Sequence, residues 1–142
     1  MKSHEYSVQF RIISETLDPN EVTRSLGIQP NQVWLAGSKL GQKTFPGMWG
    51  FDGTTSDKAV FWDSLSEGLE FVLEKLWPHR QAIQRFGESG ATLIWWCANF
   101  QSGFNGGPLL SPALMARLGE FGAELFVDNF FSSSDETDDP AQ

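Results

Sequence analysis

The side chains that could perform nucleophilic or metal chemistry are few in this 142-residue sequence. The one cysteine, Cys97, lies inside the apolar run ATLIWWCANF, and the two histidines, His4 and His79, are distant from it along the chain. A nucleophile needs a base within hydrogen-bond reach, and neither histidine is placed to be that base by its neighbours in sequence. No Cys or His spacing matches a zinc site. We therefore expect a protein that is not an enzyme, with no catalytic residue, no cofactor and no metal.

Three carboxylates recur at helical spacing in the middle of the chain, at Glu67, Glu70 and Glu74. Paired carboxylates can serve as the acid and base of a catalytic site. These three lie away from the apolar positions of the same segment, on the side of an amphipathic helix that faces water. We interpret them as a solvated helix face.

The segment SGFNGGPLLS, residues 102–111, has the position of a phosphate-binding loop, between a predicted strand and a predicted helix start. Its glycines match neither the dinucleotide fingerprint nor the P-loop spacing. It contains no Lys or Arg, and Pro108 removes one backbone donor. We therefore predict a recognition loop, with Phe104 and Asn105 at its tip as partner-binding residues.

A second loop places two lysines between two tryptophans, in a chain with only 10 Lys and Arg residues. Trp34 and Trp49 bound the segment WLAGSKLGQKTFPGMW, which contains Lys39 and Lys43. Charge and cation–π contacts from such a loop could hold an anionic or aromatic ligand, so Trp34, Lys39 and Trp49 are candidate binding residues. The same pattern also fits two tryptophans that anchor the core and two lysines that keep the loop tip soluble.

Periodicity and boundary residues predict the elements that carry these segments. Residues 6–13, YSVQFRII, alternate apolar and polar side chains as a half-buried strand does. A short helix is predicted from an N-cap at Asp18 to a left-handed residue at Gly27. Two short extended pieces, NQVWLAG and GMWGFD, then flank the Trp- and Lys-containing loop and fit a hairpin or adjacent strands.

The second half of the chain predicts two further helical regions. The longest helix is expected to begin at residue 56 or 57, with Phe61 on its apolar side, and to end before Pro78. HRQAIQRF adds a short helical segment, and the strand ATLIWWCANF follows. Another helix is predicted from an N-cap at Ser111 to Gly122, before a last strand, AELFVDNFF.

This order of elements, β-α-β-β-α-β-α-β, predicts the fold class. Its first six elements match the βαββαβ pattern of ferredoxin-like proteins. We expect an α+β, two-layer sandwich with a ferredoxin-like core, an extra αβ unit and a mostly antiparallel sheet. Residues 1–131 would form a single domain, and the acidic tail 132–142, which is nearly free of apolar residues, would be disordered.

Trp95 and Trp96 are adjacent on a predicted strand, so their side chains point to opposite faces of the sheet. If helices cover one face, the other carries one of these tryptophans, together with Phe126 and Phe130 from the last strand. An exposed aromatic patch marks a contact surface, which makes Trp95 and Trp96 candidate partner-binding residues. The chain could also cover this face itself, through residues 34–49 or the segment after Phe130.

Charge limits the kind of partner. The chain has 10 Lys and Arg against 18 Asp and Glu, a net charge of −8. Half of that net charge comes from the four carboxylates of the tail, which are Asp135, Glu136, Asp138 and Asp139. Phosphate backbones are repelled by such a molecule, so we expect no nucleic-acid partner. A basic protein would be attracted.

The sequence also indicates a compartment. It contains no apolar run near the ~18 residues of a membrane span, and its first residues have no apolar signal segment. A single cysteine cannot form an internal disulfide, which agrees with a reducing compartment. We predict a cytoplasmic protein that does not bind membranes and is a monomer or a weak homodimer.

Several segments together resemble a bacterial family that is described only as a domain of unknown function. They are LDPNEVTRSLGIQPNQVWLAGSK, the later GMWGF, and LLSPALMARLGEFGAELFVDNFF. The most specific pieces are Leu26-Gly27-Ile28-x-Pro30 and Trp34-x-x-Gly37, and the likeness spans nearly the whole chain except the tail. Relatives of this kind resemble immunity proteins, small cytosolic inhibitors that bind a bacterial toxin. The resemblance implies no catalytic residues.

Two functions follow as expectations. The first is a non-enzymatic immunity or inhibitor protein that neutralises a cognate toxin, a basic protein domain, by direct binding. The second is a sensor domain that binds a small molecule or peptide through the Trp34–Trp49 loop.

Overall fold

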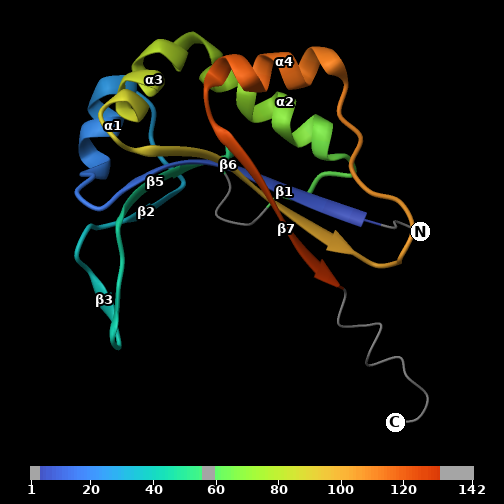
Figure 1. Ribbon diagram of the computed structural model, residues 1–142, viewed down its shortest axis with the longest axis horizontal. Coiled ribbons are helices and arrows are strands. Elements are labelled where there is room, and N and C mark those ends of the chain that lie inside the picture. The colour runs from blue at the N-terminus through green and yellow to red at the C-terminus, as the bar shows by residue number, and fades with distance from the viewer. Residues whose placement is uncertain (1–3, 56–59, 132–142) are drawn as a thin grey trace.

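The computed structural model describes residues 4–55 and 60–131 (Figure 1). The predicted disordered tail, 132–142, lies outside these residues. In chain order the elements are β1 (His4–Ser14), α1 (Pro19–Leu26), β2 (Gln32–Trp34), β3 (Lys39–Leu40), β4 (Lys43–Thr44), β5 (Gly47–Phe51), α2 (Leu65–Leu76), the short 3-10 helix η1 (Trp77–His79), α3 (Arg80–Glu88), β6 (Thr92–Gln101), α4 (Pro112–Phe121) and β7 (Glu124–Phe131).

Five strands form one mixed sheet in the order β2-β5-β1-β6-β7. The neighbours β2·β5, β5·β1 and β1·β6 are antiparallel, and β6·β7 is parallel. The strands β3 and β4 form a separate hairpin. All the helices lie on one side of the five-stranded sheet, and the hairpin projects toward the other side (Figure 1). The predicted α+β class and mostly antiparallel sheet are confirmed.

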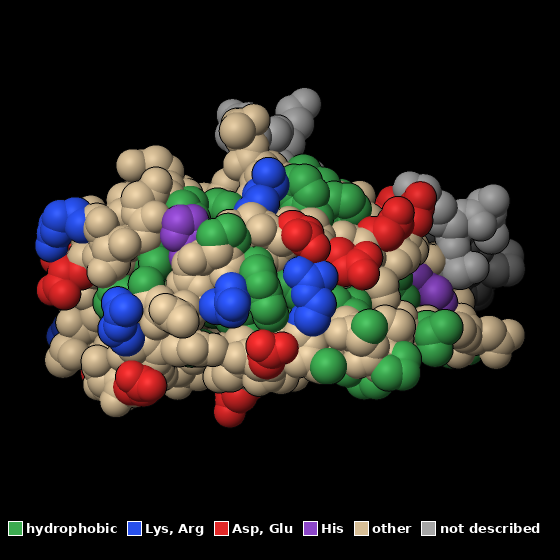
Figure 2. Space-filling model, turned by 90° about the horizontal axis from the view of Figure 1, so that it is seen from above, with side chains coloured by type: hydrophobic (Ala, Val, Ile, Leu, Met, Phe, Trp, Pro, Cys, Tyr) green, Lys and Arg blue, Asp and Glu red, His purple; other side chains and the backbone are tan. Residues whose placement is uncertain are grey.

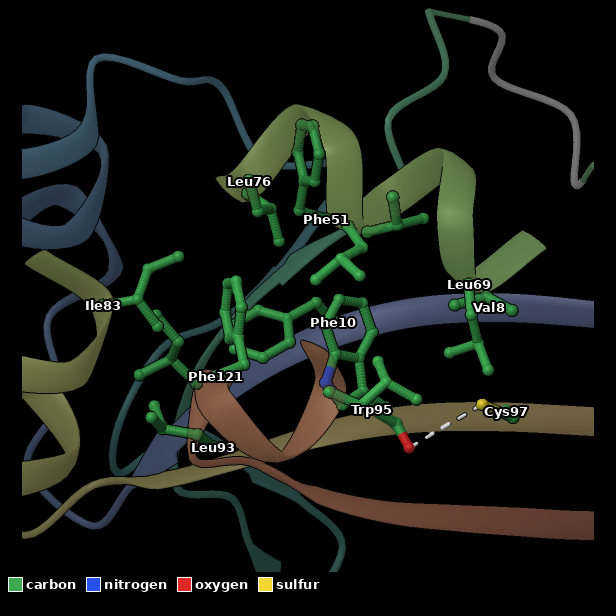
Figure 3. Packing of buried hydrophobic residues seen from close by; sticks show 14 of the residues in the cluster. Val8, Phe10, Phe51, Leu69, Leu76, Ile83, Leu93, Trp95, Cys97 and Phe121 are labelled. Atoms are coloured by element: carbon green, nitrogen blue, oxygen red, sulfur yellow. Dashed lines mark hydrogen bonds between the residues drawn. The ribbon is translucent and has the colours of Figure 1, made fainter. Parts of the chain in front are cut away.

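The core lies between the helices and the sheet. On β1, Tyr6, Val8, Phe10 and Ile12 are buried and alternate with half-buried residues, as predicted for a strand with one covered face. Phe10 pairs with Trp95 of β6. Their rings meet edge to face at 4.8 Å, an arrangement that aromatic pairs favour (Figure 3).

The predicted boundaries of α1 and α4 are confirmed. The Asp18 carboxylate accepts a hydrogen bond from the Asn20 backbone N–H at 3.0 Å, and the Ser111 hydroxyl accepts one from Leu114 N–H at 3.1 Å. Gly122, in the left-handed region at φ 78°, ends α4. None of the helices in residues 4–55 and 60–131 is long and apolar enough to cross a membrane.

The predicted start of the longest helix is wrong. Its first positions, 56–59, lie outside the described residues, and α2 begins only at Leu65, after an N-cap at Ser64. Phe61 is not helical, and Trp62 forms a β-bridge with Tyr6 through two backbone hydrogen bonds of 2.7 and 2.9 Å. The reason is that β5 pairs with β1 only at residues 10–14, which leaves backbone groups of Tyr6 to be satisfied by Trp62.

Candidate functional site

The side chains of the sheet that point away from the helices form a surface that we call the open face. Because alternate residues of β1 are buried under the helices, Gln9 and Arg11 lie on this face. Across the sheet, Gln9 pairs with Trp96, and Trp96 pairs with Phe126. Trp34 joins the same face from the edge strand β2. Four strands therefore contribute aromatic or basic side chains to one surface.

Arg11 lies in the middle of the open face, between two indole rings. Its guanidinium carbon is 4.5 Å from the centre of the Trp96 ring and 5.5 Å from the centre of the Trp34 ring. Its Nε donates a hydrogen bond of 2.7 Å to Oε1 of Gln9. Burial lowers the pKa of the Arg11 guanidinium from its usual value, although an arginine stays protonated at neutral pH. We call Arg11, Trp34 and Trp96 the arginine clamp.

A glycine of β5 makes room for this arrangement. Gly50 lies opposite Arg11 in the sheet, and a Cβ atom at this position would lie 2.7 Å from Oε1 of Gln9. A glycine inside a strand marks such a close approach. The missing side chain lets the Gln9 amide lie over β5, where it holds the Arg11 guanidinium in place.

A second part of the open face is a row of aromatic rings that we call the aromatic strip. The Trp96 and Phe126 rings lie 4.8 Å apart, and Phe100 stacks on Phe130 at 5.3 Å. Phe61 meets Phe100 edge to face at 5.4 Å. The four phenylalanines are 36–47% exposed. Three of them are joined by ring contacts, and Phe126 contacts Trp96. The two groups lie on the same face of β6 and β7, so exposed apolar area is concentrated there rather than scattered over the surface.

Carboxylates lie within the aromatic strip. On β7, Glu124 and Asp128 alternate with Phe126 and Phe130 and so share the open face with them. Asp128 pairs with Ala98 of β6 and is half-buried. The helix side differs, because Lys, Arg, Asp and Glu are interspersed over it (Figure 2). The strip therefore combines apolar area with negative charge.

Two of the predicted partner-binding tryptophans belong to the core. Trp95 is fully buried and packs against Phe121 of α4 (Figure 3). Trp49 is also fully buried, and its Nε1 donates a hydrogen bond of 3.1 Å to Oγ1 of Thr23 in α1. Of the adjacent pair, Trp96 is the one on the open face. Trp49 is a core anchor, and Trp34, half-buried against Arg11, is the tryptophan of that loop that reaches the surface.

The remaining predicted residues lie outside the open face proper. Lys39 is exposed on the β3–β4 hairpin, and the neighbouring Lys43 lies over the Phe45 ring at 5.5 Å. Phe104 is 92% exposed on the loop after β6. The backbone oxygen of Asn105 accepts a 2.8 Å hydrogen bond from His4 Nε2. The predicted combination of Lys39 with two tryptophans does not form, because Trp49 points into the core.

Arg11 and Phe61 were not among the predicted site residues. The signal for Arg11 was its place on the polar face of a strand that becomes the central strand of the sheet. Phe61 was assigned to a helix, and its position became clear only from the pairing of Trp62 with β1.

The groups considered for catalysis lie apart from one another. Cys97 is buried beside Trp95, and burial raises the pKa of its thiol to about 12. His79 lies in η1, at the start of α3. Glu67, Glu70 and Glu74 are exposed on α2, where Glu74 pairs with Arg117 at 3.0 Å. No cluster of three His, Cys, Asp or Glu residues able to hold a metal exists within residues 4–55 and 60–131.

Fold and surface together define a small α+β protein with a helix-covered sheet face and an aromatic open face. The chain belongs to the family named as domain of unknown function DUF4279, whose sequence profile matches residues 4–132. This agrees with the predicted resemblance to such a family. No curated protein and no solved structure matches the chain.

Proposed function

We propose that this protein is a non-catalytic binding protein that holds a basic protein partner against the aromatic strip. The observation that carries the proposal is a set of four exposed phenylalanines on one face, with Glu124 and Asp128 beside them: three are joined by ring contacts, and the fourth, Phe126, contacts Trp96. Aromatic side chains supply much of the binding energy at protein interfaces. Carboxylates beside them attract and orient Lys and Arg side chains of a partner.

The net charge favours a protein partner over a nucleic acid or an anionic lipid surface. The net charge of −8 disfavours both nucleic acids and anionic lipid surfaces, since each presents phosphate groups. The same charge would speed the encounter with a basic protein. The partner that fits best is a basic toxin domain, so the protein would act as an immunity or inhibitor protein in the cytoplasm.

Two structural assignments accompany this proposal. The order β2-β5-β1-β6, with α1 after β1 and α2 after β5, supports a ferredoxin-like core to which α4 and β7 are added. We also propose that the protein is a monomer or a weak homodimer before the partner binds, which size-exclusion chromatography at several concentrations would test.

A binding assay against the product of the adjacent gene tests the proposed function. The encoded protein is immobilised, and association and dissociation rates are measured at low and high salt. Association should slow as salt rises, because charge steers the encounter. Phe126→Ala should raise the dissociation rate ~30-fold or more, about 2 kcal/mol of binding free energy, while the variant keeps its fold. Phe104→Ala tests whether the loop after β6 contributes a second anchor.

The matched control for Phe126 is Met115→Ala, which removes an exposed apolar side chain from α4 on the helix side. Asp128→Asn, which removes a carboxylate beside the aromatic strip, should slow association, and its matched control is Glu70→Gln on α2. If the helix-side variants weaken binding and the open-face variants do not, the assignment of the surface is wrong. If the wild-type protein ignores the gene product at every salt concentration, the immunity proposal is wrong.

One observation supports the second candidate function, a ligand sensor. Trp34 reaches the open face and contacts Arg11, although Trp49 and Lys39 do not join it. A ligand of such a sensor would therefore contact the arginine clamp rather than the lysines of the hairpin.

A further inference from the structure

The arginine clamp presents a cation that has no anionic partner in the described part of the chain. Arg11 forms no ion pair with a carboxylate of residues 4–55 or 60–131, and its one hydrogen bond there runs from Nε to Gln9. The two outer nitrogen atoms of the guanidinium carry four further N–H donors. Half-buried between Trp34 and Trp96, these donors have lost part of their water without gaining a charged acceptor.

A hollow of about 180 Å³ opens beside the clamp. Arg11, Gln9 and Thr54 bring polar groups to it, and Trp96 and Val60 bring apolar surface. Its volume lies well below the ~300–1,000 Å³ of pockets that hold drug-sized ligands. The hollow therefore suits a ligand of about one ring, with an apolar body against the indole and a polar end toward the guanidinium.

The charges around the hollow select among anions. Asp52 also lines it, and Oδ1 of this carboxylate accepts hydrogen bonds from the backbone N–H and the hydroxyl of Thr54, at 2.9 and 2.8 Å. A carboxylate that lines the same hollow as the clamp disfavours ligands with two or more negative charges, such as phosphate esters. A planar monocarboxylate matches the fork of an arginine, which can donate two parallel hydrogen bonds to it.

We propose that the hollow beside Arg11 is a binding site for a small planar monocarboxylate. The carboxylate accepts hydrogen bonds from the guanidinium, and the apolar part of the ligand lies on Trp96. This site deepens the second candidate function, the ligand sensor, and requires no second protein. It is formed by β1, the segment after β5 and Trp96, and it shares only Trp96 with the aromatic strip.

Benzoate is the probe, and benzamide is its neutral counterpart of the same shape. Titration of the full chain is followed by calorimetry and by the indole N–H signals of the ¹⁵N-labelled protein. Benzoate should bind and shift the Trp96 and Trp34 signals, while benzamide and inorganic phosphate should do neither. Arg11→Gln should weaken benzoate binding about tenfold or more, since it removes charge-assisted hydrogen bonds. Arg11→Lys should recover only part of the affinity, because lysine keeps the charge without the fork.

Arg24→Gln is the control, since it removes an exposed arginine of α1 on the helix side and should leave benzoate binding unchanged. Circular dichroism establishes that each variant is folded. If Arg11→Gln does not fold, the wild-type comparison of benzoate with benzamide still decides. The proposal is overturned if benzoate leaves both indole signals unshifted, if benzamide binds equally well, or if phosphate binds as tightly as benzoate.

Discussion

Two helix glycines allow the packing of α2 on the sheet to be tested by one substitution at two sites. A Cβ at Gly68 would lie 2.7 Å from Cδ1 of Trp62 and 2.9 Å from Cγ2 of Val8. A Cβ at Gly119, in α4, would meet nothing within 4 Å. Both glycines lie inside helices, so alanine should gain about 1 kcal/mol of helix propensity at either position. Only Gly68→Ala adds a clash.

The difference between the two variants isolates that clash. Extra atoms in a packed core cost roughly 1–3 kcal/mol, and the gain in propensity cancels when Gly68→Ala is compared with Gly119→Ala. Gly119→Ala should therefore be more stable than the wild-type protein by about 1 kcal/mol. Gly68→Ala should be less stable than Gly119→Ala by roughly 1–3 kcal/mol. For a domain of this size, 1 kcal/mol corresponds to ~3 °C in melting temperature.

Urea unfolding followed by fluorescence, together with calorimetry, measures both differences. If the two variants change stability by the same amount and in the same direction, Trp62 does not lie between α2 and β1. This measurement also tests the candidate site, because the position of Trp62 determines the position of its neighbour Phe61. With Trp62 under the helix, its neighbour Phe61 faces the opposite side and contacts Phe100 on the open face.

Three further outcomes concern the core. Leu69→Ala should cost about 2–5 kcal/mol of unfolding free energy, since Leu69 is fully buried; a loss below ~1 kcal/mol in urea unfolding would contradict the packing of α2. Gly47→Ala should destabilise the fold more than Gly68→Ala does, because the new Cβ would strike the backbone oxygen of Leu17; thermal melts compare the two. Above pH 9.0 the unfolded chain releases the Cys97 proton, whereas the folded protein holds it up to about pH 12, so the free energy of unfolding should fall over this range. Cys97→Ala should remove that part of the pH dependence, and an unchanged slope would contradict the burial of the thiol.

Much of the fold was predictable because it depends on local rules. Alternation in β1 identified the buried face, and capping residues such as Asp18 and Ser111 placed the starts of α1 and α4. The failure occurred at Phe61, where the apolar spacing with Leu65 fits a helix. A long-range requirement overrode this spacing: the backbone N–H and C=O of Tyr6 need hydrogen-bond partners, and Trp62 supplies them. No local pattern in the sequence records this pairing.

The candidate site was less predictable for the same reason. Alternation on β6 and β7 predicted an open face that carries one of the two tryptophans together with Phe126 and Phe130, and in the structure that tryptophan is Trp96. It could not say which of Trp95 and Trp96 is buried, because that depends on where the helices pack. Arg11 is brought to Trp34 and Trp96 by strands far apart in the sequence, so only the sheet order reveals the clamp.

Two adjacent residues of strand β6 belong to different parts of the protein, one to the core and the other to the open face. Trp95 packs against Phe10 and Phe121 in the core, while Trp96 contacts Arg11 and Phe126 on the open face. Substitutions at the two positions should therefore separate stability from binding. Trp95→Ala should cost ~3–5 kcal/mol of unfolding free energy, the range for a buried aromatic. Trp96→Ala should lower the free energy of unfolding by less, because a half-buried side chain loses less buried apolar area. It should, however, weaken the binding of benzoate and of the protein partner at the open face. Unfolding and binding measured on both variants test this, and equal effects of the two substitutions on both quantities would show that the two faces of β6 are not separate in function.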